Sequence, residues 1–63
     1  MAYVWHTNKE KPRKDAKVEV EYIDRGVVVS GIGYYMACCF EYVFNICGYV
    51  VETENIIKWK YTK

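Results

Sequence analysis

The fold is set largely by the stretch Lys17-Val-Glu-Val-Glu-Tyr-Ile-Asp-Arg-Gly-Val-Val-Val-Ser-Gly-Ile-Gly33. Its first half alternates apolar with polar side chains, which is the two-residue period of a strand that buries one face. The apolar face of this strand carries Val18, Val20 and Tyr22. Asp24-Arg25-Gly26 then supplies a turn, because Gly26 can adopt positive φ, and Val27–Gly33 resumes with three β-branched residues. Two such runs around a glycine-bearing turn predict a β-hairpin.

Two further strands are expected outside this hairpin. Tyr3–Thr7 is predicted as a short first strand, and the polar segment Asn8–Ala16, which holds the single proline, as the loop that follows it. Asn55–Thr62 alternates again and is predicted as the last strand, entered through a turn at Thr53–Asn55. Its two faces are expected to consist of Ile57, Trp59 and Tyr61 on the apolar side and of Ile56, Lys58 and Lys60 on the largely basic side.

Residues 34–51 fit two different structures. One set of apolar residues recurs at helical spacing, which leaves a short helix near residues 36–44 as an alternative. The same segment also alternates from Phe40 to Ile46 and is rich in Tyr, Phe, Val and Ile, which favour strands. We therefore predict two strands, about Gly33–Phe44 and Tyr49–Glu52, joined near Asn45–Gly48 with Gly48 in the turn.

Together these elements predict an all-β fold with a single small domain over residues 1–63. The expected architecture is a small antiparallel sheet of five or six strands, either a strongly bent meander or an SH3-like barrel. Gly31 and Gly33 are candidate bend points at which a long strand can curl. An α+β domain with one short helix is the alternative. The expected core consists of Val18, Val20, Tyr22, Val27, Val29, Ile57 and Trp59, with Trp5 packed against Trp59.

The short chain has a narrow margin of stability. A domain of this size buries only about 60% of its unfolded surface, so aromatic packing or self-association commonly adds to its stability. Aromatic residues make up 17% of the chain and include seven tyrosines, a residue type enriched at the buried centres of interfaces. A homodimer is therefore one of the expected states.

The cysteines and the hydropathy pattern bear on the compartment. Cys38, Cys39 and Cys47 fit neither a disulfide framework nor a zinc site, so we expect buried free thiols in a reducing compartment. No signal peptide is evident, and polar residues interrupt the most apolar stretch, whereas a membrane span needs about 20 mostly apolar residues. The expectation is a soluble, cytoplasmic protein that does not bind a membrane.

Catalysis is not expected, because an enzyme needs an acid, a base or a nucleophile held in a cleft. His6 is the only histidine, and no serine or cysteine lies at a recognisable spacing from it. Glu19 and Glu21 lie two apart on one strand face, a pattern that a solvated face explains. No glycine-rich phosphate loop is present. We therefore predict no catalytic residue, no metal and no cofactor, and expect the protein to act by non-covalent binding.

Charge is segregated along the chain. Residues 1–17 hold five basic residues against two acidic ones, residues 58–63 hold three basic residues, and residues 18–57 hold one basic residue against six acidic ones. If the ends meet, residues 9–17 and 58–63 form a basic edge suited to nucleic acid or another polyanion. Alternatively, Glu19 and Glu21 pair with Lys58 and Lys60 across neighbouring strands, each pair contributing about 0.2–1 kcal/mol. On that second interpretation the pattern reports strand neighbours, with no ligand involved.

The chain also resembles a family of short phage and prophage proteins of unknown function. The resemblance rests on Trp5, the loop with Pro12, the Val18-x-Val20-x-Tyr22 strand and the closing Ile57-x-Trp59, and it covers about half of the chain. Lys60–Lys63 stands where many members carry a proline-rich tail. What the resemblance implies is a mobile-element origin, a small β fold and, for the compartment, the cytoplasm of a bacterial host cell. It implies no activity.

These observations favour a binding module that acts by protein–protein interaction, through modulation of a host factor, self-association or both. The supporting feature is an excess of tyrosines over what so small a core can hold. Nucleic-acid or polyanion binding is the alternative. The candidate binding residues are Lys9, Lys11, Arg13, Lys14, Lys58 and Lys60, with Tyr34, Tyr35 and Tyr42 as aromatic contacts.

Overall fold

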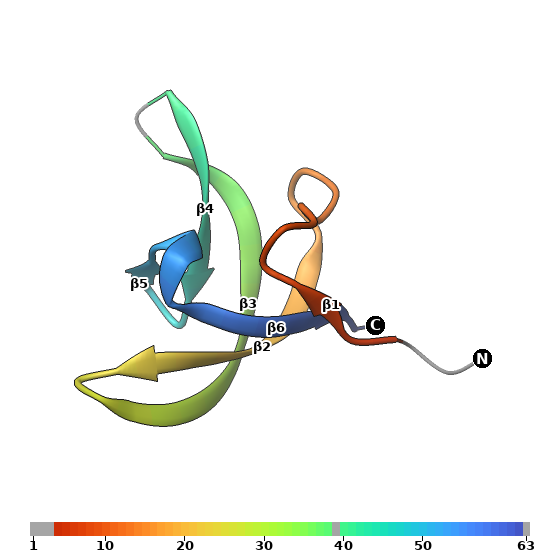
Figure 1. Ribbon diagram of the computed structural model, residues 1–63. Coiled ribbons are helices and arrows are strands. Elements are labelled where there is room, and N and C mark those ends of the chain that lie inside the picture. Colours follow the sequence, from red (N-terminus) through yellow and green to blue (C-terminus); the bar gives the residue numbers. More distant parts are fainter. Residues whose placement is uncertain (1–3, 39, 63) are drawn as a thin grey trace.

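The computed structural model describes residues 4–38 and 40–62, and it confirms the all-β prediction (Figure 1). A single antiparallel sheet contains six strands, and no helix of seven residues or more occurs in the described part, which rules out the helical alternative there. The strands are β1 (His6–Thr7), β2 (Lys17–Asp24), β3 (Val27–Cys38), β4 (Glu41–Ile46), β5 (Tyr49–Val51) and β6 (Ile56–Tyr61), with a 3₁₀ turn, η1 (Thr53–Asn55), before β6.

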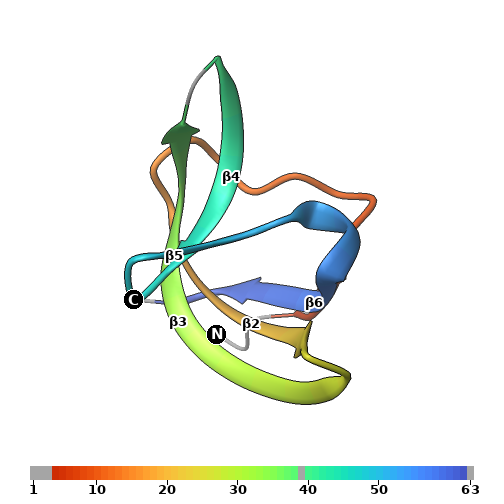
Figure 2. The same cartoon turned by 90° about the vertical axis from the view of Figure 1, so that its left-hand side faces the viewer.

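The strand order is β1-β6-β2-β3-β4-β5, so β2 to β5 form consecutive hairpins and β6 returns to pair with β2. The long strand β3 belongs to both halves of the sheet. Its residues 27–34 pair with β2, and its residues 33–38 pair with β4. Figures 1 and 2 show β3 curving through a wide arc between these partners, which turns β4 across the direction of β2 and β6. The sheet is strongly bent but not closed, and β1 and β5 are its edges.

The bend in β3 depends on two glycines that face β4. A Cβ atom on Gly33 would collide with the backbone oxygen of Asn45 and would lie 2.8 Å from Cα of Ile46. A Cβ atom on Gly31 would lie 2.6 Å from Cγ2 of Ile46. At Gly33 the backbone of β4 therefore approaches β3 so closely that a side chain does not fit, whereas at Gly31 the nearest atom belongs to a side chain.

Two short turns connect the hairpins as predicted. Arg25 and Gly26 have φ of 54° and 80° between the paired residues Asp24 and Val27, and Cys47 and Gly48 have φ of 52° and 86° after β4. Positive φ at both central residues is the geometry that matches the twist of a two-residue hairpin. The predicted strand Gly33–Phe44 is wrong, because β3 ends at Cys38 and β4 begins at Glu41. Phe40 turns the chain with φ of 74°, a conformation that no sequence signal announces.

The buried residues confirm the predicted inward face of β2 but differ from the prediction in β3 and β6. Its cluster of buried residues consists of Val18, Val20, Tyr35, Phe44, Ile46, Val51, Ile56 and Trp59. Ile57 was expected inside but is 41% exposed, and Ile56 takes its place. The pairing register of β2 and β6 shifts between Glu21 and Tyr22, because β6 contains one extra residue there. Before this bulge, Ile56 therefore points inward and Ile57 outward. Val27 is exposed at the end of its hairpin, whereas Tyr22 and Val29 are half-buried.

The first strand is shorter than predicted and packs differently. The described part of Tyr3–Thr7 forms β1 only at His6–Thr7, and Tyr3 lies outside the described residues. The ring of His6, rather than that of Trp5, stacks on Trp59 with centroids 4.4 Å apart. Adjacent strand residues point to opposite faces, so Trp5 and His6 cannot both reach the core.

Candidate binding surfaces

Hydrogen bonds from the indole of Trp59 and from the side chain of Asn8 connect the loop of residues 8–16 to the sheet. The Nε1–H group of Trp59, a residue only 1% exposed, donates to the backbone oxygens of Thr7 (3.1 Å) and Glu10 (3.0 Å). His6 continues this cluster, since its Nδ1 atom lies 2.6 Å from Oε2 of Glu10. Asn8 anchors the loop to the other end of β6 by donating from Nδ2 to the backbone oxygen of Ile56. The loop is therefore a packed element whose lysines project from a fixed base.

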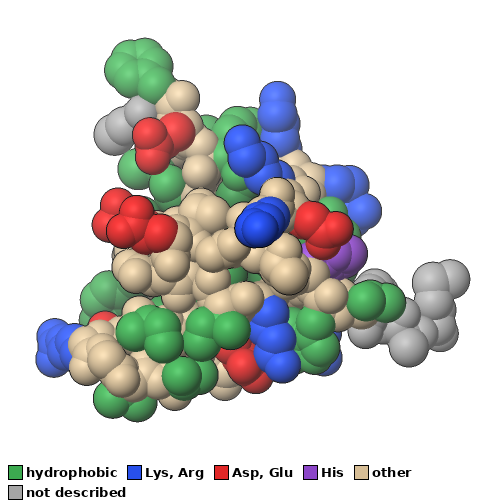
Figure 3. Space-filling view, viewed as in Figure 1, with side chains coloured by type: hydrophobic (Ala, Val, Ile, Leu, Met, Phe, Trp, Pro, Cys, Tyr) green, Lys and Arg blue, Asp and Glu red, His purple; other side chains and the backbone are tan. Residues whose placement is uncertain are grey.

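Two of the predicted cations lie over aromatic rings at the end of this loop. The guanidinium carbon of Arg13 is 4.5 Å from the centroid of Tyr61, whose hydroxyl accepts a hydrogen bond from the Arg13 backbone N–H. The ammonium group of Lys14 is 5.4 Å from the centroid of Tyr42. Lys9 and Lys11 are exposed on the same loop, and Figure 3 shows Lys and Arg side chains gathered around it. All four cations of this group are exposed.

A groove of about 450 Å³ lies beside the loop. Lys11 and Lys14 line it together with Glu41, an arrangement that mixes both signs of charge. The rings of Tyr35 and Tyr42 stack in this groove with their centroids 5.6 Å apart. The pKa of the Tyr35 hydroxyl is raised above its ordinary value, mainly because the group is buried and to a lesser degree because Tyr42 lies beside it. The prediction that Tyr35 is a surface contact is wrong, because its side chain belongs to the core. Tyr42 is half-buried beside it.

Lys58 and Lys60 form part of a charge ladder on the outer face of β2 and β6. Nζ of Lys60 lies 3.7 Å from Glu19, and Nζ of Lys58 lies 3.8 Å from Glu21, with each pair directly across the two strands. Both ammonium groups also lie 4.6 Å from the ring centroid of Trp5, so the ring sits against two cations. The second interpretation of the segregated charges therefore describes the structure of this face. The two lysines are neutralised by neighbours, whereas the loop lysines are not part of this ladder.

Reversing one charge of the ladder should cost little and should be reversible by its partner. Lys60→Glu places two carboxylates opposite each other, so we expect the free energy of unfolding to fall by about 1 kcal/mol at low salt. The double variant Lys60→Glu with Glu19→Lys restores the opposite-charge pair and should recover most of that loss. Urea denaturation at low and high salt measures both effects. A single variant that unfolds the protein would contradict the placement of Lys60 on the outer face of β6.

The outer face of β3 carries a row of exposed apolar side chains, which we name the β3 row. The β3 row consists of Val28, Ile32, Tyr34 and Met36. Tyr34 is 48% exposed, as the sequence led us to expect, and it lies across from Lys17 on one side and from Asn45 on the other. The row runs toward the β3–β4 turn, where Phe40 is fully exposed. Phe40 could not be singled out from the sequence, because the alternation from Phe40 to Ile46 fitted a continuous strand.

Two cysteines lie at other positions than expected, and metal-ligating side chains do not cluster in the described residues. No group of three or more metal-ligating side chains occurs among residues 4–38 and 40–62. The expectation of buried thiols is wrong for two cysteines, since Cys38 and Cys47 are both exposed; Cys39 lies outside the described residues. Sγ of Cys47 lies 3.8 Å from the backbone oxygen of Ile32.

No helix in the described part of the chain is long and apolar enough to cross a membrane. Comparison with protein-family models, curated proteins and solved structures gives no match for this chain. The resemblance to the phage family therefore stays a prediction.

Proposed function

We propose that this protein is a small non-enzymatic binding module, encoded by a phage or another mobile element, that acts in the bacterial cytoplasm by binding a protein. The observation that carries the proposal is Phe40, a fully exposed aromatic side chain at the end of the β3–β4 hairpin. Figures 1 and 3 show this end of the hairpin projecting from the body with an apolar side chain upon it. A single exposed aromatic residue on a projecting turn has the form of an anchor that enters a pocket of a partner.

The backbone at Phe40 strengthens this interpretation. Its φ of 74° lies in the left-handed region, which costs a bulky L-residue about 1–2 kcal/mol. A phenylalanine that is also fully exposed gains no burial to offset that cost. Glycine would fit the turn better, so stability does not account for the residue. Strain of this kind supports a functional reason for an aromatic side chain at the turn.

The β3 row supplies a second area of contact next to this anchor. Interfaces of ordinary size bury about 800 Å² on each partner, around a central apolar cluster. The described chain exposes 4755 Å², so such an interface would cover about one sixth of it. Tyr34 and Met36 of the β3 row pair with β4, so they lie on the same hairpin arm as Phe40, where a single partner can contact all three.

The charge ladder supports protein binding over a polyanion ligand. A basic edge would need the terminal lysines and the loop lysines to act together, but Lys58 and Lys60 each lie within 4 Å of a glutamate. A phosphate backbone would displace those pairs and meet two carboxylates at the same place. In residues 9–17, Lys9, Lys11, Arg13, Lys14 and Lys17 remain for phosphate contacts, and Glu10 and Asp15 lie among them.

The sharpest test separates binding from stability at one position. Phe40→Gly relieves the left-handed strain, so we expect the free energy of unfolding to rise by about 1 kcal/mol. The same change removes the anchor, so the partner captured from bacterial lysate by the tagged wild-type protein should be lost. Urea denaturation measures the first effect, and quantitative capture of that one partner measures the second.

Val4→Gly is the matched control, since Val4 is 67% exposed and precedes β1 at the opposite edge of the sheet. It should leave capture unchanged. Light scattering of the purified protein identifies self-association, which should also be lost in Phe40→Gly if the partner is a second copy. Capture and self-association that are both unaffected by Phe40→Gly would overturn the proposal.

A further inference from the structure

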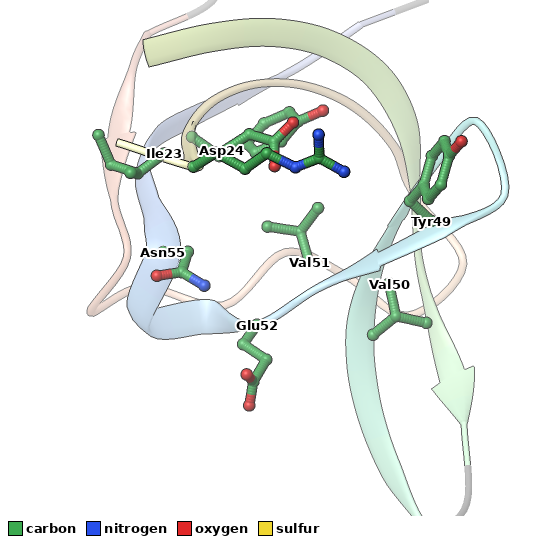
Figure 4. Close-up of a pocket in the computed structure, with 9 residues that line it drawn as sticks. Ile23, Asp24, Tyr49, Val50, Val51, Glu52 and Asn55 are labelled. Carbon is green, nitrogen blue, oxygen red and sulfur yellow. The ribbon is translucent and has the colours of Figure 1, made fainter. Parts of the chain in front are cut away.

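The sheet has a gap at one end, bordered by two strand edges, and we name it the β5 gap. It forms a groove of about 450 Å³ between β5 and the end of the β2–β3 hairpin (Figure 4). Its lining consists of Tyr22, Ile23, Asp24 and Arg25 from the hairpin, Tyr49, Val50, Val51 and Glu52 from β5 and its exit, and Asn55 from η1. The volume falls within the range of about 300–1,000 Å³ that is usual for ligand sites.

One side of the gap offers an edge backbone on β5. Ile46 and Tyr49 close the two-residue turn and therefore form a hydrogen-bonded pair, so the next pair, Asn45 with Val50, is of the non-hydrogen-bonded kind. The N–H and C=O groups of Val50 consequently point away from β4, toward the edge of the sheet. Edge strands commonly carry charged residues, which discourage pairing with a further strand, but β5 carries none.

The other side of the gap offers a matching backbone on β2. Asp24 and Val27 close the first hairpin turn, so the same alternation directs the N–H and C=O groups of Ile23 away from β3. On that side β6 reaches only as far as Ile56, which pairs with Tyr22. The end of β2 therefore extends beyond β6 and borders the gap.

The chemistry of the lining indicates what fits between these edges. Figure 4 shows Val51 pointing into the gap below Asp24, while Val50 and Glu52 point to the opposite side of β5. Val51 and the half-buried Tyr22 form an apolar floor. Asp24 and Glu52 outnumber the single cation of the lining, Arg25, so the lining has a net charge of −1.

We propose that the β5 gap binds an extended peptide of another protein by strand addition, with aliphatic side chains facing Val51 and lysine or arginine side chains facing Glu52. The peptide backbone bonds to Val50 on one side and to Ile23 on the other, which fills the gap in the sheet. Because β5 has three residues, a bound segment of about 10 Å would match it. Alternation of the peptide side chains places one set on the floor and the other on the acidic side.

Titration of ¹⁵N-labelled protein with the peptide Ac-Lys-Val-Lys-Val-Lys-NH2 tests this directly. We expect saturable chemical-shift changes centred on Tyr49–Glu52 and Tyr22–Arg25. The peptide Ac-Glu-Val-Glu-Val-Glu-NH2 should bind at least about tenfold more weakly, and a proline at the central position should weaken binding similarly because it removes a backbone donor. Shifts centred on the β3 row, or none at millimolar peptide, would overturn the proposal.

Three variants make the test independent of folding and of the proposed function. Glu52→Lys lies at an exposed position and should abolish the preference for the lysine peptide while leaving the spectrum of the rest of the sheet intact. Val50→Pro is tolerable at an edge, because the lost N–H points away from β4, and it should remove binding. Phe40→Gly should bind the peptide like the wild type. A wild-type dimer that Val50→Pro dissociates would assign the gap to a second copy of this chain and overturn the proposal.

Discussion

Gly33→Ala is expected to unfold the protein or bring it close to unfolding. The added Cβ would meet the backbone oxygen of Asn45 and Cα of Ile46, and backbone atoms in a paired strand cannot move aside without breaking the β3–β4 ladder. Overpacking of this kind costs up to about 4 kcal/mol. A domain of 63 residues has a total stability of only about 3–9 kcal/mol. Urea denaturation followed by circular dichroism measures the loss.

Gly31→Ala is the matched control for this effect. Its added Cβ would contact Cγ2 of Ile46, the end of a side chain that can change its rotamer. We expect a loss of only about 1–2 kcal/mol. If both variants lose the same free energy of unfolding, the cost comes from replacing a glycine within a strand. The close approach of the Asn45 backbone to Gly33 would then not contribute.

Trp59→Phe is expected to have the second-largest effect, a loss of about 3 kcal/mol. The smaller ring leaves space in the core, and the two backbone oxygens of Thr7 and Glu10 lose their shared donor. Because those oxygens begin the loop of residues 8–16, the loop should loosen along with the loss of global stability. Urea denaturation gives the total, and amide hydrogen exchange in residues 8–16 shows the local part.

Trp5→Phe provides the comparison, since it is the other tryptophan of the chain. Its ring lies on the outer face against Lys58 and Lys60, where cation–π contacts contribute about 0.5–1 kcal/mol each. We expect a loss below about 1 kcal/mol and no change in amide exchange of the loop. If Trp5→Phe costs as much as Trp59→Phe, the assignment of the inward and outward rings would be wrong.

Errors of the sequence interpretation have a shared cause. Tyr34 and Tyr35 are identical neighbours, as are Ile56 and Ile57, and Trp5 and His6 are neighbouring rings. In a strand, adjacent side chains point to opposite faces, so one member of each pair is inward. Nothing local says which one in the two identical pairs, and for Trp5 and His6 the greater apolarity of Trp5 favoured the wrong ring. In the structure Tyr35, Ile56 and His6 face the core cluster, and the bulge in β6 is the reason that Ile56 replaces Ile57.

The candidate surfaces were predictable to different degrees. The exposure of the loop cations followed from the polarity of the segment around Pro12. Phe40 did not, because its turn lacks the usual glycine or asparagine, and an aromatic residue at positive φ contradicts local preference. The β5 gap was also out of reach, since its lining comes from the β2–β3 hairpin, β5 and η1, which are distant in the sequence.

The sequence by itself determined the all-β strand content and the first hairpin with its Arg25–Gly26 turn, and it offered the pairing of glutamates on β2 with lysines on β6 as one of two interpretations. These features depend on short-range periodicity, turn stereochemistry and opposite charges, all of which act within a few residues or across one pair of strands. Only the tertiary structure decided which tyrosine of Tyr34 and Tyr35 is buried, where β3 ends and how β5 and β2 border one gap. Those outcomes depend on contacts between segments that are not neighbours in the chain, of which the close approach of β3 and β4 at Gly33 is one.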